Sequence, residues 1–455
     1  MFLPRRLARP FHILVCAPTN TAADVICERL TKTLTSKLDM LRLMAYSRSL
    51  SDVPEKIRRL TNWDAAVGSF ETPPLDQILK PTVVVATLTK AGGLINLGVP
   101  RGHFDLIVVD EGGQAFEAEA MAPIGCLLGP SAQLVLGGDP KQLGPVVHHA
   151  LAKEHGLGMS FLERLMERSI YQKETLPHAP NFGQHDTRVI TKLVRNYRSH
   201  ATLLELPNRL FYENELLACV DPFNGNKCLH WEGLEAAGVP LLWHGIIGQD
   251  RREANSPSWF NPDEAVQVLA HVRDLLAMRH NKLEQRNIGV ITPYNKQVHR
   301  ITMALRSAGF GGVKVGSTEM FQGQEREVII ISTVRSSEQW LDFDVQHNLG
   351  FLDNPKRFNV AITRAKALLI VVGNPSTLAS DYHWRELLKL CVAKGAYRGA
   401  PLPHLEDVEG AGDASRADEE DELVNDLEQL LLDEEPEQPS QQVQQEGMEM
   451  PSHDY

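Results

Sequence analysis

The sequence predicts an α/β protein with two domains, each built on a parallel β-sheet that helices cover on both faces. Two observations lead to this fold class. Short runs rich in β-branched residues alternate with longer helix-like stretches, and glycines or polar residues follow directly where several of the runs end. Continuous apolar runs of this kind are typical of strands that are buried on both faces of a parallel sheet.

The expected strands fall into two groups along the chain. They cover residues 12–16, 82–87, 105–109 and 133–137 in the first half, and 288–292, 328–332 and 367–372 in the second. Helix-like stretches are expected over 21–30 and 262–279. A polar stretch with two prolines, 171–188, separates the two groups. We therefore expect a first domain over 11–170, a linker over 171–188 and a second domain over 189–404.

Three other segments have their own composition. Residues 1–10 form a basic, atypical N-terminus, and residues 31–80, which show no strong period, are a candidate insertion within the first domain. Residues 405–455 hold eighteen acidic residues and one basic residue, a net charge of −17 against −12 for the whole chain, so residues 1–404 carry +5. A mildly basic body can bind a polyanion. The acidic C-terminal tail, poor in aromatic residues, is expected to be disordered.

One part of the tail has a helical pattern. Four leucines fall on one face of a predicted acidic helix, namely Leu423, Leu427, Leu430 and Leu431. Such a helix can dock on a partner protein, and the tail is therefore a candidate for recruiting protein partners. A solvated helix without a partner explains the same pattern.

Composition excludes several classes of protein. No stretch approaches the ~18 uninterrupted apolar residues of a membrane span, so no membrane association is expected. No apolar signal-peptide core follows the basic residues 1–10, which favours a cytoplasmic or nuclear protein. None of the six cysteines forms a Cys-x-x-Cys pair, so neither a zinc site nor a disulfide framework is indicated.

Two carboxylates follow the expected strand at 105–109. Asp110 and Glu111 should emerge from the buried sheet at its carboxyl end, where ligands bind in open α/β sheets. Asp110 can hold Mg²⁺, and Glu111 can orient and deprotonate an attacking water, which are the requirements of phosphoryl transfer. A solvated turn with two acids is the alternative, and Gln114 together with the next motif disfavours it.

A glycine- and proline-rich loop follows the expected strand at 133–137. The string 137–145 reads Gly-Gly-Asp-Pro-Lys-Gln-Leu-Gly-Pro, and its glycines and prolines predict a tight turn. Gln142 is then presented with an amide that both donates and accepts, which suits contact with a γ-phosphate or with the attacking water. The alternative is an ordinary turn with an incidental glutamine.

Two arginine motifs lie in the second half. Arg195, Tyr197 and Arg198 belong to Arg-Asn-Tyr-Arg-Ser-His, and Arg364 to Ala-Ile-Thr-Arg-Ala-Lys. A guanidinium that reaches a γ-phosphate from a second domain raises the rate of hydrolysis by about 10³–10⁵. Tyr197 can stack on a base. Surface solvation or a contact to a nucleic-acid phosphate is the alternative for each single arginine.

Small polar residues at strand ends are candidates for contacts with a nucleic-acid backbone. Such residues and their free amides can follow a strand without reading its bases. The candidates are Pro18, Thr19, Asn20, Thr87, Ser317 and Thr318. Helix capping by Thr19 or Asn20 is an adequate structural alternative, and both roles can hold together. Nearby, Gly323 permits close backbone approach and Glu325 can accept a hydrogen bond from a ribose hydroxyl.

Taken in order, these segments resemble superfamily 1 helicases related to the nonsense-mediated-decay helicase, and most closely the Moloney leukaemia virus 10 (armitage-type) RNA helicase family. The resemblance covers about residues 11 to 400. It is carried by the strings at 16–20, 160–165, 193–200, 255–265, 314–326 and 348–370. It implies two RecA-like domains, the first incomplete and without its central strand, with ATP and Mg²⁺ between them and single-stranded RNA across their top, moving 5′-to-3′.

The resemblance also implies roles for individual residues. Asp110 and Glu111 match the Mg²⁺ and water-activating pair, and Tyr197 and Glu325 match contacts to adenine and ribose. The residues that match sensors of the γ-phosphate are Gln142, Arg198 and Arg364. Family membership implies work in small-RNA-guided silencing and messenger turnover, with silencing-complex proteins as partners, in cytoplasmic ribonucleoprotein granules (P-bodies).

The sequence departs from the family pattern in two places. Gly112 stands where the family usually has Ala. No Gly-x-x-x-x-Gly-Lys-Ser/Thr string, the Walker A loop that cradles phosphates, occurs in the 455 residues, and residues 1–10 do not resemble the end of its helix. Three hypotheses therefore stay open: an RNA helicase in fragment or shortened form, a non-catalytic RNA-binding scaffold derived from a helicase, and a DNA helicase of the same superfamily.

Overall fold

The structure is a computed structural model. It describes residues 10–33, 40–147, 149–174, 183–252, 258–336, 351–352 and 354–405. The contacts separate the chain between Pro403 and His404. The expectations for residues 1–9 and for the tail from 406 onward, including its leucine helix, lie outside the described residues.

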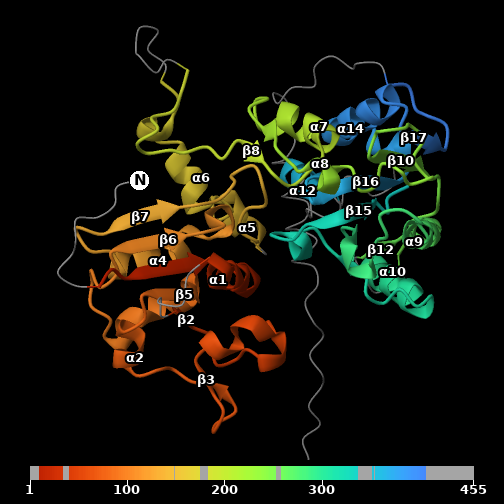
Figure 1. Ribbon diagram of the computed structural model, residues 1–455. Coiled ribbons are helices and arrows are strands. Elements are labelled where there is room, and N and C mark those ends of the chain that lie inside the picture. The colour runs from red at the N-terminus through yellow and green to blue at the C-terminus, as the bar shows by residue number, and fades with distance from the viewer. Residues whose placement is uncertain are drawn as a thin grey trace, which may run out of the picture. The chain divides into compact units, whose positions relative to one another are not determined.

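The first sheet has five parallel strands, shown side by side in Figure 1. In spatial order they are β2 (Met40–Arg42), β5 (Val83–Thr87), β1 (Ile13–Ala17), β6 (Leu106–Val109) and β7 (Gln133–Leu136). The pairing is unbroken, since Val15 lies opposite Val85 on one side and Val108 on the other. The described strands leave no gap between neighbours, so a further strand has room only outside β2 or β7.

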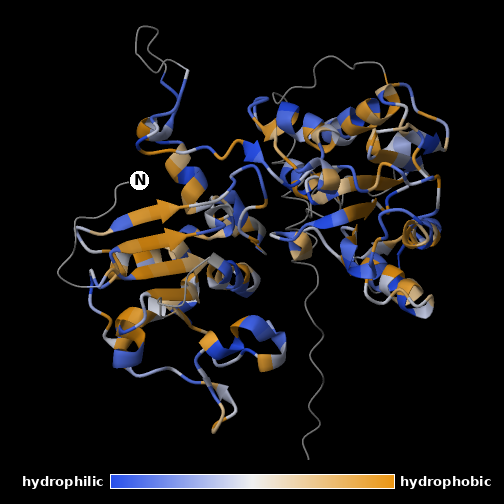
Figure 2. Ribbon diagram, viewed as in Figure 1, coloured by the Kyte–Doolittle hydropathy of each residue, from blue (hydrophilic) through white to orange (hydrophobic). Residues whose placement is uncertain are grey.

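Both faces of this sheet are covered at β5, β1 and β6, which is why these strands are continuously apolar. The edge strand β7 keeps one exposed face, where Val135 is 48% exposed. Alternate residues of β1 belong to different cores: Leu14 and Cys16 pack with α3 (Leu88–Gly92) and α4 (Glu117–Leu127), whereas Val15 and Ala17 pack with α1 (Asn20–Thr33). In Figure 2 these strands are coloured almost wholly as hydrophobic, while the helices mix hydrophobic and hydrophilic residues. The predicted α/β class with a parallel sheet is thereby confirmed for the first half.

Residues 31–80 contribute to both the sheet and its cover. Their first strand, β2, is an edge strand of the sheet, and three residues are too few for a sequence period to reveal. The later residues form short elements, namely η1 (Leu50–Asp52), η2 (Glu55–Leu60), the β3–β4 hairpin (Trp63–Asp64 and Ser69–Phe70) and α2 (Leu75–Leu79). Val53, Ile57 and Phe70 from these elements are buried in the same core as α1.

A run of short elements joins the two sheets. Helix α3 is extended by η3 (Gly93–Leu97), within the first sheet's cover. The connection after β7 contains α5 (Ala150–Glu154), α6 (Phe161–Met166) and η5 (Ser169–Tyr171). It ends at β8 (Arg195–Asn196), which pairs with β9 (Leu217–Ala218). The segment that begins at β8 is fixed to the second sheet: Ser199 Oγ donates to the carbonyl of Ala365 at 2.8 Å, and His200 N donates to that of Lys366 at 2.9 Å.

The second sheet has six strands, and every pairing between them is parallel. In spatial order they are β14 (Lys314–Gly316), β13 (Ile288–Ile291), β15 (Arg326–Ser332), β16 (Ala365–Gly373), β10 (Leu241–Gly245) and β17 (Tyr397–Gly399). The three strands that the sequence predicts here, β13, β15 and β16, form its centre. The two-domain α/β architecture is therefore confirmed.

Helices cover the second sheet as well. The longer ones are α7 (Ala201–Phe211), α9 (Pro262–Leu276), α10 (Asn295–Ser307), α12 (Pro355–Ile362) and α14 (Tyr382–Ala393). The shorter elements are α8 (Pro222–Gly225), α13 (Pro375–Leu378), η6 (Gln285–Asn287) and η7 (Glu319–Phe321). Helix α9 starts where predicted because Asn261 caps it, accepting hydrogen bonds from the amides of Asp263 and Glu264. Within the described part of the chain, every helix is too short or too polar to cross a lipid bilayer.

Candidate functional site

The turn after β6 presents two carboxylates. Asp110 continues the sheet pairing through its amide, which donates to Cys16 O at 2.9 Å, and its Oδ1 accepts from the Glu111 amide at 3.0 Å. Glu111 has a left-handed backbone with φ of 55°, an uncommon conformation for a residue with a side chain. Both residues thus stand at the carboxyl end of β6, as the sequence predicts for residues that leave a buried strand.

The environment of Glu111 makes it a better base than an ordinary glutamate. Burial and the neighbouring negative charge of Asp110 raise the pKa of Glu111, although the side-chain amide of Gln114, which donates to Oε2 at 2.7 Å, acts in the opposite direction. A carboxylate with a raised pKa binds a proton more readily and suits the role of a general base.

The loop after β7 packs directly on the turn after β6. Gly112 N donates to Gly137 O at 2.7 Å, and a Cβ on Gly138 would stand 2.8 Å from Gly113 N. Only a residue without a side chain fits at 138. At 112, a Cβ would stand 3.2 Å from Gly137 O, a tight contact that this glycine avoids.

The close packing brings Asp139 and Gln142 to the side of Glu111. Asp139 Oδ2 accepts from Gln142 Nε2 at 2.8 Å and from the phenol of Tyr212 at 2.7 Å. Tyr212 follows α7 and so belongs to the second half of the chain. Burial and the charge of Asp139 raise the pKa of Tyr212, which keeps its hydroxyl protonated and donating.

Arg364 approaches the same place from the end of α12. Its Nη2 donates to Gln142 Oε1 at 3.2 Å and its Nε to Val360 O at 3.1 Å, while the side chain is only 2 % exposed. Burial, followed by repulsion from Arg198, lowers the pKa of Arg364 to about 10. It forms no ion pair with a carboxylate among the residues that the structure describes, so a buried cation here fits an anionic ligand.

One asparagine closes these contacts into a ring between the two halves of the chain. Asn359 Nδ2 donates to Tyr212 Oη at 2.8 Å and to Lys141 O at 2.9 Å. Asn359 and Arg364 both belong to α12 or its end, so the path from Asn359 through Tyr212, Asp139 and Gln142 returns to the same helix. The ring fixes the orientation of the Gln142 amide, since each of its atoms has a partner.

A third group from the second half stands next to this ring. Glu325 lies 3.6 Å from Arg198 Nη2 and 3.7 Å from Lys366 Nζ, and its negative charge also acts on Arg364. Gly323 has φ of 69°, and a Cβ built on it would lie 4.0 Å from Glu111 Oε1. The predicted residues Glu111, Gln142, Arg198, Arg364, Gly323 and Glu325 therefore lie in one neighbourhood. Tyr197 is 66 % exposed and Arg195 is exposed.

The backbone-contact candidates of the first half lie at the carboxyl ends of neighbouring strands and have structural roles. Thr19 Oγ1 accepts from Ala22 N at 3.2 Å, Asn20 Oδ1 accepts from Arg42 Nη2 at 3.0 Å, and Thr87 Oγ1 accepts from Lys90 N at 3.4 Å. Pro18 directly precedes Thr19. Helix capping by Thr19 is thus present, as the structural alternative predicts.

The candidates of the second half follow β14. Ser317 Oγ accepts from Met320 N at 3.4 Å. Thr318 is only 1 % exposed, and its Oγ1 has no hydrogen-bond partner within the part of the chain that the structure describes. A buried hydroxyl without a partner is uncommon. Thr318 therefore does not present its hydroxyl on the surface of this structure, whereas Ser317 is only partly buried.

The donor set suits a polyphosphate with a divalent cation. The described residues contain no cluster of three or more His, Cys, Asp or Glu that holds a metal alone. Mg²⁺ in phosphate-transfer sites is bound by one or two carboxylates together with phosphate oxygens, for which the exposed Asp110 is sufficient. The buried guanidinium of Arg364, which forms no ion pair with a carboxylate of the described residues, supplies the charge that an anion needs.

Sequence reasoning missed three residues of the ring. Asp139 lies within a motif that the sequence singles out, but nothing there marks its carboxylate as the acceptor for two side chains. Tyr212 and Asn359 meet across 147 positions of the chain. The only available signal is the spacing of Asn359 and Arg364, which places both at the end of one helix.

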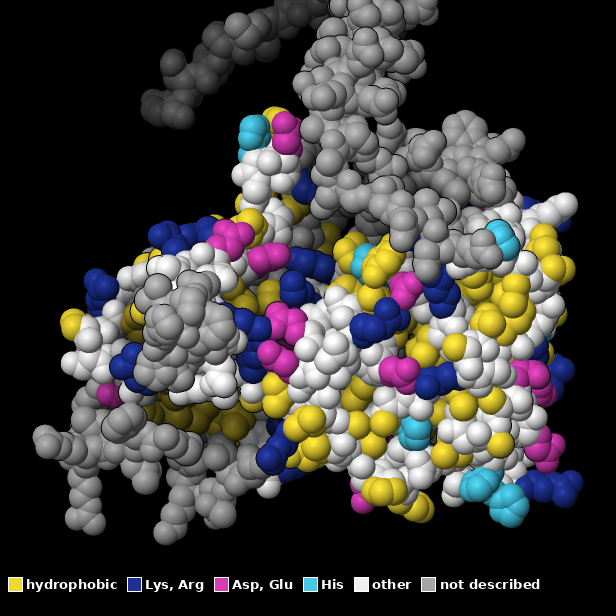
Figure 3. All heavy atoms as spheres, turned by 90° about the horizontal axis from the view of Figure 1, so that it is seen from above, with side chains coloured by type: hydrophobic (Ala, Val, Ile, Leu, Met, Phe, Trp, Pro, Cys, Tyr) yellow, Lys and Arg dark blue, Asp and Glu magenta, His cyan; other side chains and the backbone are white. Residues whose placement is uncertain are grey.

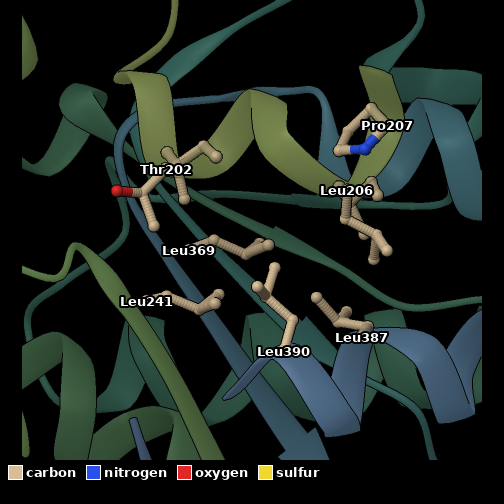
Figure 4. A pocket seen from close by; sticks show the side chains of 9 residues that line it. Thr202, Leu206, Pro207, Leu241, Leu369, Leu387 and Leu390 are labelled. Atoms are coloured by element: carbon tan, nitrogen blue, oxygen red, sulfur yellow. The ribbon is translucent and has the colours of Figure 1, made fainter. Parts of the chain in front are cut away.

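An apolar pocket in the second half is not a competing site. It lies between α7, β10, β16 and α14, and in Figure 4 Leu241, Leu369, Leu387 and Leu390 point toward one another across it. Its volume is about 10 Å³, the least that holds one water molecule. The lining carries no ionisable group, so it is a packing defect of the core.

Comparisons with known proteins agree on one kind of protein. Two family models, each described as "AAA domain", match residues 76–150 and 157–376. "Putative helicase MOV-10" of Gallus gallus is 43% identical over 445 residues, 92% of this chain and 44% of that protein. "RNA helicase Mov10l1" of Homo sapiens is 44% identical over 409 residues, 88% of this chain and 32% of that one.

A more distant relative extends the set. "Probable RNA helicase armi" of Drosophila melanogaster is 38% identical over 420 residues, which are 87% of this chain and 35% of that protein. The chain thus spans less than half the length of these relatives.

Proposed function

The chain belongs to the MOV-10 and armitage family of helicases, and from this premise we propose that it is the motor portion of an ATP-dependent helicase that acts on single-stranded RNA. ATP with Mg²⁺ is the proposed cofactor. The observation that carries the proposal is the ring through Gln142 and Arg364, which joins groups from both halves of the chain beside Glu111.

Each residue of the site has a task in ATP hydrolysis. Mg²⁺, when bound, neutralises phosphate charge, and Asp110 is the residue that would hold it. Glu111 accepts the proton of the attacking water, for which its raised pKa prepares it. Gln142 orients that water or the terminal phosphate, and Arg364 and Arg198 stabilise the charge on the phosphate that is transferred.

The nucleoside part of ATP would lie against the second half of the chain. Tyr197 is the proposed adenine contact, because its ring is largely exposed and free to stack. Glu325 is the proposed ribose contact, and Gly323 lets the backbone approach. Arg198 and Lys366 stand beside Glu325, at 3.6 Å and 3.7 Å from its carboxylate, whose oxygens can accept a hydrogen bond from a hydroxyl.

Single-stranded RNA is the proposed substrate. Two of the relatives are named RNA helicases, and the candidates for backbone contact lie at the carboxyl ends of strands in both sheets. Family membership alone supports the finer proposals: movement 5′-to-3′, a role in RNA-mediated silencing and messenger turnover with silencing-complex proteins as partners, and a place in cytoplasmic ribonucleoprotein granules.

A non-catalytic RNA-binding scaffold is the second candidate function. The sequence contains no Gly-x-x-x-x-Gly-Lys-Ser/Thr string, whose backbone amides and lysine hold the phosphates in related enzymes. A non-catalytic RNA-binding scaffold would keep the fold and the nucleic-acid surface while losing turnover. A DNA helicase remains the third reading, because motor motifs barely distinguish the two nucleic acids.

The experiment measures phosphate release and binding for the same chain. Wild type is compared with Arg364→Ala, with no nucleic acid, with oligouridine and with the matching deoxyribo-oligonucleotide. Release that only RNA stimulates and that Arg364→Ala loses supports the proposed function. Salt-sensitive RNA binding without release favours the scaffold, and equal stimulation by DNA contradicts RNA specificity.

A further inference from the structure

A two-stranded ribbon sits at the carboxyl ends of the second sheet. It consists of β11 (Arg251–Arg252) and β12 (Trp259–Phe260), which pair antiparallel, with the connecting residues 253–257 outside the described part. Strand β12 lies beside α10 (Figure 1). Trp259 packs in a small separate core with Tyr294, which follows β13, and Val334, which follows β15. The ribbon is therefore held against the sheet rather than projecting from it.

The pairing assigns its side chains to two faces. Arg252 is opposite Trp259, and Arg251 is opposite Phe260. Directly opposed residues of an antiparallel pair point to the same face. Trp259 is buried beneath the guanidinium of Arg335, 4.1 Å from the ring centre, so this face is directed to the sheet.

The other face carries two arginines around one aromatic ring. Arg251 and Phe260 share it by register, and the guanidinium of Arg300, from α10, lies 4.8 Å from the centre of the Phe260 ring. Arg251 and Arg300 are both exposed, whereas Phe260 is half-buried. We call these three residues, Arg251, Phe260 and Arg300, the ribbon ridge.

Val334, which packs beneath the ribbon, has a strained backbone conformation. Val334 has φ of 75°, a conformation that a β-branched residue adopts only when its surroundings enforce it. The buried carboxyl group of Glu264 accepts a hydrogen bond from the Val334 amide at 2.9 Å, and Asn261 Nδ2 donates to Val334 O at 3.1 Å. Such strain is typical of functional sites. Here it fixes Arg335 against the Trp259 ring.

Among the described residues, Asp250 and Asp263 flank the ribbon in the sequence. Asp250 forms an ion pair with Arg335, and both side chains are only 3% exposed. Asp263 is exposed, and its Oδ2 accepts from Gln249 N at 3.3 Å. On the face drawn in Figure 3, Lys and Arg side chains alternate with Asp and Glu instead of forming one basic field. Binding of a polyanion therefore needs a local arrangement of cations such as the ridge.

The ridge adjoins the strand end that holds the backbone-contact candidates. Tyr294, beneath the ribbon, follows β13, and Thr292 N donates to Gly316 O at 3.1 Å, which ties the end of β13 to the end of β14 just before Ser317. The end of β13, beneath the ribbon, is thus hydrogen-bonded directly to the end of β14, where the backbone-contact candidates begin.

We propose that the ribbon ridge is a binding site for the sugar–phosphate backbone of a single-stranded nucleic acid, with Arg251 and Arg300 on phosphates. This inference rests on the proposed function and extends its nucleic-acid surface to residues outside the motor motifs. A guanidinium is suited to phosphate by its planar fork of donors, and Phe260 holds that of Arg300 in position. Contacts to phosphates give affinity without sequence preference.

The test measures binding of labelled oligouridine to the full chain at several salt concentrations. The double variant Arg251→Ala/Arg300→Ala should bind about tenfold more weakly. Its salt slope should fall by about 1.4, which corresponds to two phosphate contacts on a single strand. The matched control is Arg286→Ala. Arg286 is 79% exposed, and it lies just before β13, at the end of the strands opposite to the ribbon. The control should change neither quantity.

Further arms separate the possible failures. Arg251→Lys/Arg300→Lys keeps the charges and should recover most of the salt slope, and thermal melting of every variant checks folding. Unchanged oligouridine binding in the folded double-alanine variant overturns the inference and leaves the proposed function standing. If the double-alanine variant loses affinity for poly-glutamate but not for oligouridine, the inference is overturned in favour of an acidic protein partner. Absence of oligouridine binding by wild type overturns both.

Discussion

Arg364 donates a hydrogen bond from Nη2 to Oε1 of Gln142 at 3.2 Å, although the two residues are 222 positions apart in the chain. The other end of the same amide donates to Asp139. Gln142 therefore has one orientation, with its oxygen toward the arginine and its nitrogen toward the carboxylate. An amide that is already oriented loses little conformational freedom when a ligand arrives.

Replacing the arginine should remove catalysis and leave nucleic-acid binding intact. In a chain extended by the phosphate-binding loop of a relative, Arg364→Ala should lower ATP turnover by about 10³–10⁵, because no other guanidinium bonds to Gln142 among the described residues. Turnover and oligouridine affinity are measured on the same preparation. Normal turnover with lost RNA affinity would reverse the assignment of Arg364.

Tyr212 should be a positioning residue for the same reaction. Tyr212→Phe removes the hydroxyl that donates to Asp139 and accepts from Asn359, so the free energy of unfolding should fall by about 0.5–1.5 kcal/mol per hydrogen bond lost. The rate constant kcat should fall while KM for ATP stays the same. Tyr382→Phe is the control, since Tyr382 is 52% exposed. A change in KM alone would argue against positioning.

The contact between the two loops should not tolerate a methyl group. In Gly138→Ala the new Cβ would stand 2.8 Å from Gly113 N and 2.9 Å from Leu162 Cδ2, so the loop must move and carry Gln142 with it. We expect a lower melting temperature together with lower turnover. Gly125→Ala is the matched control: nothing lies within 4 Å of its Cβ, and in helix α4 alanine should raise stability by about 1 kcal/mol.

Stability should depend on pH through Glu264. Burial raises the pKa of Glu264 to about 8, above its ordinary value of 4.5. The folded state therefore keeps a proton that the unfolded chain releases, so this contribution is complete below about pH 4.5 and is lost as pH rises toward 8. Urea denaturation at a series of pH values should show the decline in wild type. The decline should be weaker in Glu264→Gln. An equal dependence of the free energy of unfolding on pH in the two proteins would contradict the ionisation of Glu264 in this range.

The sequence was sufficient for the central strands and for the groups at their ends. Strands β1, β5, β6, β13, β15 and β16 are continuous apolar runs, and burial on both faces leaves them no other pattern. The edge strand β7 is also an apolar run that the sequence predicts, although its Val135 is 48% exposed. Strands β2 and β10 were missed because two to four apolar residues do not show a period. The end of α9 came earlier than expected, at Leu276.

The site could be predicted only where a local motif marks it. Glu111 and Gln142 each follow a strand within one short string, so their positions can be read from the chain. Their connection through Tyr212 and Asn359 could not, because a hydrogen bond across 147 positions depends on how α7 and α12 pack. The ribbon ridge likewise depends on the register between β11 and β12.

Phosphate release by wild type and by Glu111→Gln is the most direct test of the central claim, that both halves of the chain form one site for ATP hydrolysis. The substitution keeps the shape and removes the base, so RNA-stimulated release should fall by about 10²–10⁴. Because the pKa of Glu111 is raised, wild-type release should increase with pH above the range of an ordinary glutamate. Equal, RNA-independent release by the two proteins would contradict the claim.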